Sequence, residues 1–312
     1  MKFSVVVPTY QAAVHLDSLL PALRGQTVQP EHYIVVDSSS SDGTRDAFRA
    51  FGATVRKIEK SAFNHGGTRR FASTLSEADV PILIYITQDA IPERANAFER
   101  ILSSFADETV GIAYGRQMPR PEAGPLERFP RYFNYPEKDQ TKELADAARL
   151  GLKAFFCSDS FAAYRRKALL EVGGFPISAY CSEEQVVAAR MLLRGWKVAY
   201  RADAIVTHSH DLSVWREARR YFDIAAAYRK NAWMMAEFGA PEGEGARYVA
   251  AELAYLWREA PGLIPAALVR TAAKFIFYNL GWHHEVLPVE VRRLLSSQPQ
   301  QWRAEASASL KS

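Results

Sequence analysis

The sequence predicts an α/β fold, in which a mainly parallel β-sheet is flanked by helices and followed by a C-terminal helical extension. Three observations support this prediction. In the first half of the chain, short apolar runs alternate with segments of helical periodicity. These apolar runs are continuous, which is typical of strands that are covered on both faces of a parallel sheet. From Ser213 onward the pattern is helical and rich in Arg, Trp, Tyr and Ala.

The individual elements follow from apolar runs, β-branched residues and helix-ending glycines. We expect strands at residues 3–7, 33–36, 54–58, 81–86 and 110–115, and helices at residues 14–23, 44–51 and 94–105, with a further helix opening at Asn64. Residues 119–150 are rich in proline, charge and aromatics, which predicts a long functional loop with a helical end. After Ser158 a strand, a helix over residues 182–193 and another strand resume the α/β pattern.

These patterns divide the chain into three parts: an α/β domain over residues 1–212, a helical region over residues 213–295, and a tail over residues 296–312. The tail is dominated by Ser, Gln and Ala, a composition that predicts disorder. The 312 residues suffice for a substantial core, and the net charge of +4 suits an anionic substrate or an anionic membrane surface.

The sequence also bounds the cellular setting. Cys157 and Cys181 are the only cysteines, so no disulfide framework is expected and a reducing cytoplasm is the expected location. The N-terminal apolar run is cut by Pro8, which makes it too short for a signal peptide. No uninterrupted apolar stretch reaches the roughly 18 residues of a membrane span, so no transmembrane helix is expected.

Two aspartates follow apolar strands, at the edge where ligands of such sheets bind. Asp37, in "IVVDSSSSDGT", either accepts a hydrogen bond from a nucleobase or shapes the strand-to-helix turn, whereas Asp42 is favoured as a helix cap. Asp89, in "LIYITQDAIP", is a candidate ligand for Mg²⁺ or Mn²⁺ or else a cap of the next helix. The glycine-rich nucleotide signatures G-x-G-x-x-G and G-x-x-x-x-G-K-[ST] are absent from the sequence.

A pair of glutamates opens a later helix in "YCSEEQVVAARMLLRGW". Ser182 is expected to cap this helix, with Glu183 and Glu184 in its first turn. The helix dipole alone favours acidic residues there. The pair also offers a general base, because burial can raise the pKa of one carboxyl toward neutrality.

Taken together and in order, these segments resemble the inverting nucleotide-sugar glycosyltransferases of family two, which have the Rossmann-like GT-A fold. The resemblance is carried by "VVVPTY", "VVDSSSSDGT", "QDA", "GGFP", "SEEQVVAARMLLRGWKVAY" and "VTHSH", and covers about residues 1–212. The segments "FNHGGTRR", "TQDAIP" and "HSHDLS" are more narrowly similar to bacterial rhamnosyltransferases that use dTDP-L-rhamnose.

The resemblance implies a role for each site residue. Nucleotide-sugar binding is expected of Pro8, Thr9, Tyr10, Asp37, Asn64, His65, Gly66, Gly67, Arg69 and Gln88. Asp89 is similar to the last aspartate of the family's metal-binding D-x-D, and His208 matches a histidine that completes the metal site in some members. Thr87 stands where the first aspartate would be, so the metal is expected to be held weakly. Glu183 and Glu184 match the family's Glu-Asp pair, and Glu184 falls on the residue usually assigned as the base.

The glycines of "FNHGGTRR" then have a ready interpretation. Backbone N–H groups at a glycine-rich helix start approach an anion without a side chain in the way. Arg69 is expected to bond the diphosphate oxygens, and Asn64 and His65 the sugar hydroxyls. The alternative is a solvated basic helix with Asn64 as its N-cap.

The implied activity is a single displacement that inverts the anomeric carbon. Glu184 deprotonates an acceptor hydroxyl, and the dTDP leaving group departs with Mg²⁺ or Mn²⁺ held at Asp89. The donor is expected to be dTDP-β-L-rhamnose, and the product an α-L-rhamnoside in cell-surface polysaccharide or lipopolysaccharide assembly. Alternatives are a transferase that uses UDP-glucose, UDP-galactose or UDP-N-acetylglucosamine, and a non-catalytic sugar-nucleotide-binding scaffold. A membrane polysaccharide synthase would require transmembrane helices and a Gln-x-x-Arg-Trp segment.

The helical region leaves two interpretations open. Residues 262–282, "GLIPAALVRTAAKFIFYNLGW", nearly form a membrane span, but Arg270 and Lys274 interrupt it. The region either packs on the catalytic domain or forms a homodimer, or it binds the cytoplasmic face of the inner membrane, with basic residues on anionic lipid headgroups. Membrane binding suits a lipid-linked saccharide acceptor. No nucleic-acid partner is expected.

Overall fold

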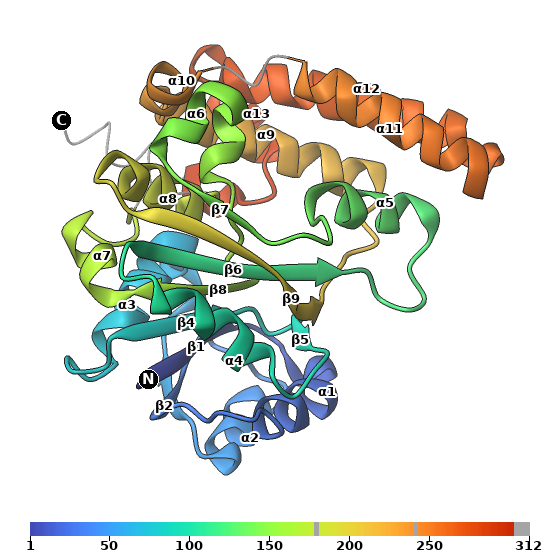
Figure 1. Ribbon diagram of the computed structural model, residues 1–312. Helices are drawn as coiled ribbons and strands as arrows, with labels where there is room; N and C mark the ends of the chain where they lie inside the picture. The colour runs from blue at the N-terminus through green and yellow to red at the C-terminus, as the bar shows by residue number, and fades with distance from the viewer. Residues whose placement is uncertain (178–180, 240–242, 303–312) are drawn as a thin grey trace.

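The computed structural model describes residues 1–177, 181–239 and 243–302. A mixed β-sheet crosses the middle of the molecule, with helices against both faces and further helices beyond one end (Figure 1). Its strands are β1 Phe3–Thr9, β2 His32–Asp37, β3 Thr54–Lys57, β4 Ile82–Ile86, β5 Ile91–Pro92, β6 Val110–Met118, β7 Gln140–Lys142, β8 Phe161–Arg165 and β9 Lys197–Thr207. The predicted α/β class with a C-terminal helical extension is confirmed.

The helices of the α/β part are α1 Ala13–Arg24, α2 Thr44–Phe51, α3 His65–Thr74, α4 Ala97–Leu102, α5 Pro125–Asn134, α6 Ala147–Leu150, α7 Arg166–Glu171 and α8 Glu183–Leu193. Short 3-10 turns lie at Lys60–Ala62, Ser103–Ala106, Leu144–Asp146, Gly151–Phe155, Pro261–Leu263 and His284–Val286. The segment predicted as a loop over residues 119–150 is more regular than expected, because it contains α5, β7 and α6.

The strand order is β3-β2-β1-β4-β8-β6-β9-β5, with β7 paired to β9. The first four of these strands are parallel, whereas β8 runs antiparallel to both β4 and β6. Thr9 pairs with Asp37, so the carboxyl ends of β1 and β2 meet at one edge of the sheet. This is the edge where a parallel sheet binds its ligands.

Two hydrophobic cores sandwich the sheet, as the alternation of side chains along a strand requires. Val5 and Val7 of β1 pack in the core that includes α1, α2 and α4. Val6, between them, packs in the core that includes α3, α7 and α8. Each face of the sheet is therefore covered, which explains why the strands read as continuous apolar runs.

The C-terminal helices are α9 Val214–Lys230, α10 Trp233–Phe238, α11 Glu244–Glu259, α12 Ile264–Trp282 and α13 Val289–Leu295. They form a layer on the opposite side of the sheet from α1 and α2 (Figure 1). The helices α9 and α12 pack closely together, because a Cβ on Gly281 would lie 2.2 Å from the Phe222 carbonyl oxygen. Only a glycine allows the two backbones to approach this far.

One helix among the described residues is long and apolar enough to cross a membrane: Pro261–Trp282, with a mean hydropathy of 1.2. Length and composition alone single it out, which is weak evidence for a span. The two basic residues that were expected to interrupt it face inward in the structure. Arg270 and Lys274 lie 3.0 and 3.5 Å from the carboxylate oxygens of Glu217 on α9.

The tail differs from the disorder expected from Ser296 onward. Ser296 and Trp302 are both fully buried, and Trp302 packs with Phe222 and Ala226 of α9. A single tryptophan buries enough apolar surface to hold a polar segment in place. Residues 303–312 of the predicted tail lie outside the described part of the chain.

Candidate active site

A cavity of about 930 Å³ lies at the carboxyl ends of β1, β2 and β4. We call it the strand-end cavity; it is lined by Pro8, Thr9, Tyr10, Ser38, Glu59, Lys60, Ser61, Phe63, His65, Arg69, Thr87, Gln88, Ser297, Gln298 and Gln300. Six of the residues predicted to bind the donor are among them. The volume is within the range of small-molecule sites.

Tyr10 holds a fixed position in the wall of this cavity. The Tyr10 backbone N–H donates to Gln88 Oε1 at 2.8 Å, and Gln88 Nε2 donates to the Tyr10 carbonyl at 3.1 Å. The ammonium of Lys60 lies 4.4 Å from the centre of the Tyr10 ring and donates to its hydroxyl. The pair presents an aromatic surface with a positive charge at its edge, which suits a base next to a phosphate.

Asp37 lies beneath the cavity wall and is fully buried. Its carboxylate accepts hydrogen bonds from Thr9 Oγ1 at 2.9 Å, from the Ser40 N–H at 2.8 Å and from the Ser40 hydroxyl. Arg45 adds an ion pair at 3.5 Å. Asp37 therefore shapes the turn, and its bond to a nucleobase stays a prediction. Asp42 was expected to cap α2, but the N-cap of this helix is Gly43; the Asp42 carboxylate instead accepts from the backbone N–H groups of Thr44 and Ala13, which ties the turn to the start of α1.

The helix start at "FNHGGTRR" is explained by contacts within the chain. Asn64 is the N-cap of α3, and its Oδ1 accepts from the Gly67 N–H at 2.6 Å. A Cβ on Gly66 would lie 1.9 Å from the carbonyl oxygen of Pro176. Gly66 is thus needed for the close approach of Pro176. Whether this helix start also binds an anion stays a prediction.

Arg69 is buried and pairs with two carboxylates that are far away in sequence. Its Nη1 lies 2.6 Å from Glu183 Oε1, and its Nε lies 2.8 Å from Asp159 Oδ2. Asp159 also accepts a hydrogen bond from the Tyr164 hydroxyl at 2.5 Å. Burial raises the pKa of Asp159 to about 6, although the Arg69 guanidinium opposes the shift. Arg69 therefore acts first as a structural counter-ion, and its expected contact with a diphosphate stays a prediction.

The two glutamates of α8 have different surroundings. Glu183 is 2% exposed and bound to Arg69, whereas Glu184 is half-buried and lines a second cavity. Burial, reinforced by the charges of Glu183 and Asp159, raises the pKa of Glu184 well above its usual range. A carboxyl with a raised pKa and access to a cavity is suited to take a proton. Ser182 precedes α8 with a φ of 61°, and in the described structure its side chain does not form the expected cap.

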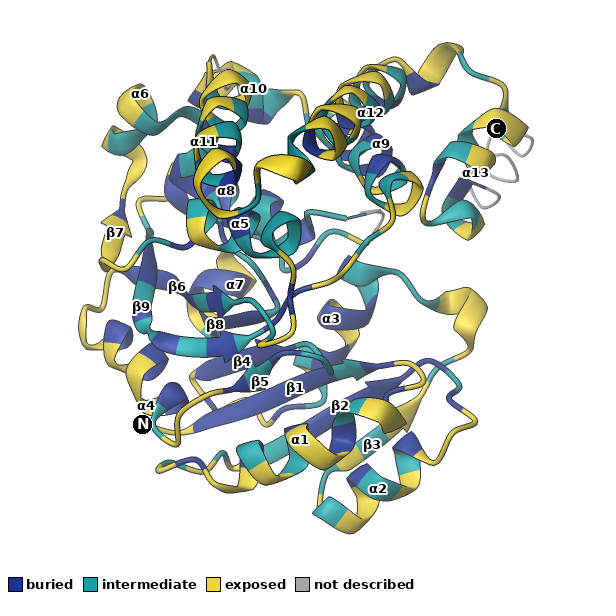
Figure 2. Cartoon of the chain, turned by 90° about the vertical axis from the view of Figure 1, so that its right-hand side faces the viewer, coloured by how far each residue is buried: buried dark blue, intermediate teal, exposed yellow. Residues whose placement is uncertain are grey.

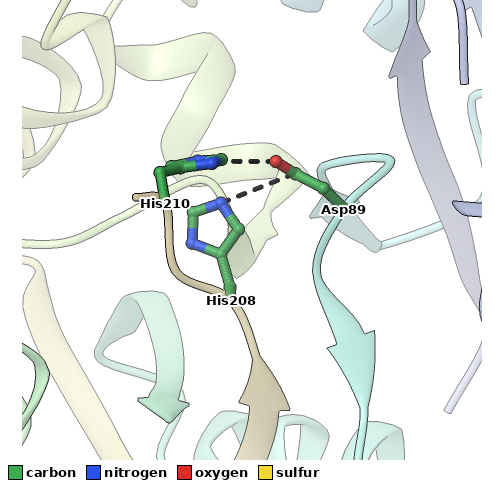
Figure 3. Close-up of side chains that lie close together, drawn as sticks. All are labelled: Asp89, His208 and His210. Carbon is green, nitrogen blue, oxygen red and sulfur yellow. Dashed lines mark ion pairs between the residues drawn. The ribbon is translucent and has the colours of Figure 1, made fainter. Parts of the chain in front are cut away.

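Asp89 and His208 lie together as predicted, and His210 joins them (Figure 3). The Nε2 atoms of His208 and His210 lie 3.5 and 3.4 Å from the Asp89 carboxylate oxygens. His208 Nδ1 lies 2.9 Å from Gln117 Oε1, a contact that leaves Nε2 directed at Asp89. We call these three residues the Asp-His-His group. Asp89 follows β4, and both histidines follow β9.

The protonation states of the Asp-His-His group suit a divalent cation. Burial lowers the pKa of His208, and burial together with His208 lowers that of His210 to about 4. Burial acts to raise the pKa of Asp89, but His208 and His210 outweigh it and hold this pKa well below its usual range. At neutral pH the group therefore offers two neutral imidazoles and one carboxylate, which are the ligand forms that bind metals.

Glu184 and the histidines of the Asp-His-His group meet at a second cavity of about 340 Å³, which we call the central cavity. Glu184, His208 and His210 line it, together with the basic side chains of Arg131 and Arg220. A third cavity, of about 380 Å³, shares His210 and Arg220 with the central cavity and Ser297 with the strand-end cavity. The central cavity and the strand-end cavity therefore lie next to each other.

Sequence reasoning missed Asp159 and His210. Asp159 gave no signal, because its partner Arg69 lies 90 positions earlier in the chain. His210 could have been found from the sequence, because two histidines separated by one residue in an extended chain point to the same side.

Comparisons with known proteins place this geometry in context. A model of the family described as "Glycosyl transferase family 2" matches residues 4–173. The O-antigen chain rhamnosyltransferase WbaN of Salmonella anatum is 41% identical over 96% of this chain and 95% of that protein. The O-antigen chain rhamnosyltransferase RfbN of Salmonella typhimurium is 39% identical over 97% and 96%.

Two solved structures have a similar fold. The mannosyltransferase PcManGT from Pyrobaculum calidifontis aligns with a TM-score of 0.56 and 20% identity, over 99% of this chain and 87% of that one. Residues 1–349 of TarS from S. aureus align with a TM-score of 0.54 and 16% identity, over 91% of both chains. At these identities the likeness concerns the fold alone.

Proposed function

The chain belongs to glycosyl transferase family 2, and from this we propose that it moves L-rhamnose from dTDP-β-L-rhamnose to a saccharide hydroxyl in O-antigen assembly. The choice of sugar is supported by the names of the two Salmonella relatives, which match nearly all of the chain at 41% and 39% identity. The observation that carries the proposed chemistry is the central cavity, which is lined by Glu184 and by both histidines of the Asp-His-His group.

In this mechanism Glu184 is the general base. The acceptor hydroxyl enters the central cavity and gives its proton to the Glu184 carboxylate while its oxygen attacks the anomeric carbon. The bond from that carbon to the diphosphate breaks, and the configuration inverts. Arg69 holds Glu183 and Asp159 in place next to the base, because its guanidinium forms an ion pair with each of these buried carboxylates. Arg131 and Arg220 add positive charge to the cavity in which the diphosphate charge develops.

The Asp-His-His group would hold a divalent cation, which when bound supplies positive charge to the leaving diphosphate. We propose Mn²⁺ rather than Mg²⁺. Mg²⁺ strongly prefers oxygen ligands, whereas imidazole nitrogens suit transition metals better, and two of the three side chains here are histidines. The similar mannosyltransferase structure was solved with GDP-mannose and Mn²⁺, which agrees with this choice.

A donor screen tests the proposed function. We expect dTDP-L-rhamnose with Mn²⁺ to raise the melting temperature of the protein more than UDP-glucose, UDP-galactose, UDP-N-acetylglucosamine or GDP-mannose. Stabilisation by a ligand grows with its concentration relative to Kd, so the ranking reports affinity. A UDP- or GDP-sugar that stabilises the protein more than dTDP-L-rhamnose would overturn the donor assignment.

We also propose that the protein works at the cytoplasmic face of the inner membrane, bound through α12. All exposed residues of this helix are uncharged, and they include Phe275 at 70% and Val269 at 60% exposure. The charged residues Arg270 and Lys274 instead face Glu217 in the interior. A helix with its charges inside and its apolar residues outside fits the boundary of a lipid bilayer. A lipid-linked saccharide acceptor would be reached from this position.

Flotation with anionic liposomes tests the membrane proposal. The wild-type protein is expected to float, and Phe275→Glu/Ile276→Glu to stay in the dense fraction, because two carboxylates on the apolar face oppose insertion. Val14→Glu is the control, since Val14 is 81% exposed on α1, at the far end of the molecule from α12 (Figure 2). Equal flotation of the double variant, or no flotation of the wild type at low salt, would contradict the proposal. Dimerisation of a wild type that does not float would identify the face as a subunit interface.

A further inference from the structure

The end of the described chain returns to the strand-end cavity. Ser297, Gln298 and Gln300 line this cavity together with Tyr10 and Gln88, although they follow α13 and lie more than 200 residues later in sequence. They also lie outside residues 4–173, the part of the chain that the family model matches. The C-terminal segment over residues 296–302 is therefore one wall of the cavity, and nothing so far assigns it a role.

This segment is anchored on both sides of the residues that face the cavity. On the C-terminal side of these residues, Trp302 is fully buried. The centre of its ring lies 5.9 Å from that of Phe222 and 5.2 Å from that of His284. On the N-terminal side, the buried carboxylate of Asp223 accepts hydrogen bonds from the Ser296 hydroxyl and, at 2.8 Å, from the Ser297 N–H. A segment fixed at both ends holds its middle residues in defined positions.

The side chain of Gln298 contacts the first turn of α3. Gln298 Oε1 accepts a hydrogen bond from Gln300 Nε2 at 2.7 Å, which orients the amide. Its Nε2 then lies 3.4 Å from Nε2 of His65. The amide N–H groups are donors, and His65 is in the first turn of α3. Gln298 thus brings hydrogen-bond donors to the side of the cavity that carries His65 and Arg69.

This side of the strand-end cavity is close to the proposed base, Glu184, and to the Asp-His-His group. Arg69 binds Glu183, the neighbour of Glu184, and Ser297 lines the third cavity together with His210 of the Asp-His-His group. In the same cavity as Gln298, the Tyr10 ring offers an aromatic surface for the nucleoside, with the ammonium of Lys60 4.4 Å from the centre of the ring. A nucleotide sugar that spans the two would have its diphosphate and sugar oxygens within reach of Gln298.

We propose that Gln298 is a donor-binding residue, whose side-chain amide donates hydrogen bonds to the β-phosphate or the rhamnose of the nucleotide sugar. The inference rests on the proposed function, and it extends the donor site to a segment that follows the last helix of the fold. Donors placed on an anchored segment favour anionic oxygens, and hydrogen bonds to charged groups are stronger than those to neutral ones.

Calorimetric titration with dTDP-L-rhamnose and, separately, with dTMP tests the inference. Gln298→Ala should raise the Kd for dTDP-L-rhamnose about tenfold, the usual cost of losing one hydrogen bond to a charged group. Gln298→Glu should raise it further, because it places a carboxylate beside the diphosphate. The Kd for dTMP, which lacks the rhamnose and the β-phosphate, should not change. Gln301→Ala is the matched control, since Gln301 is not among the residues that line the cavity.

The outcomes separate the inference from the proposed function. If the wild type binds dTDP-L-rhamnose and Gln298→Ala binds it equally well, Gln298 does not contact the donor, while the proposed function stands. If Gln298→Ala weakens dTMP as much as dTDP-L-rhamnose, or lowers the melting temperature more than Gln301→Ala does, the residue has a structural role and the inference is wrong. If the wild type binds no nucleotide sugar, the proposed function fails and the inference with it.

Discussion

Replacing Glu184 with glutamine is expected to leave donor affinity close to that of the wild type and to lower kcat by about 10²–10⁴-fold, the usual contribution of a general base. The amide keeps the shape of the side chain but cannot accept the acceptor's proton. Because the base must be ionised, the wild-type kcat should rise with pH through a pKa above the ordinary glutamate range, as the burial of Glu184 beside Glu183 and Asp159 implies. Single-turnover rates with saturating donor measure the effect.

Glu183→Gln is the control for this experiment. Glu183 pairs with Arg69 at 2.6 Å and does not line the central cavity, so its replacement should reduce kcat less than Glu184→Gln does. Loss of a buried ion-pair partner should instead lower the free energy of unfolding. Reversal of the two kinetic results would move the base to Glu183.

The second large effect is expected at Asp89. Asp89→Ala should abolish metal-dependent donor binding and transfer, because no other carboxylate belongs to the Asp-His-His group in the described part of the chain. His210→Ala should retain partial activity and should reduce the preference for Mn²⁺ over Mg²⁺, since it removes one imidazole. Activity titrated with each metal after EDTA treatment measures both variants. A near-normal rate of Asp89→Ala at saturating Mn²⁺ would show that Asp89 only shapes the turn after β4.

The sequence was informative where the relevant contacts are local. Asn64 as the cap of α3 and the turn formed by Asp42 could be read from short motifs, because the partners lie within three residues. Continuous apolar runs predict buried strands, and these runs placed Asp37 and Asp89 correctly at strand ends. The pairing of Asp89 with His208 followed from the resemblance to the family.

The remaining features depend on contacts between distant segments. The glycine run at α3 suggested an anion site, yet Gly66 is required by the approach of Pro176, which lies 110 positions later. Arg69 was predicted to bind a diphosphate, and its ion pair with the buried Asp159 could not be foreseen from the sequence. The tail read as disordered because its composition is polar, and the burial of Trp302 against α9 depends on the tertiary fold.

The most direct test of the account is the anomeric configuration of the product that the wild-type protein forms from dTDP-β-L-rhamnose and a saccharide acceptor, measured from the one-bond carbon–hydrogen coupling of the new linkage. A single displacement, with Glu184 taking the proton of the acceptor, inverts the anomeric carbon and predicts an α-L-rhamnoside. A β-L-rhamnoside would require retention of configuration and would contradict the assignment of Glu184 as the base of an inverting transfer.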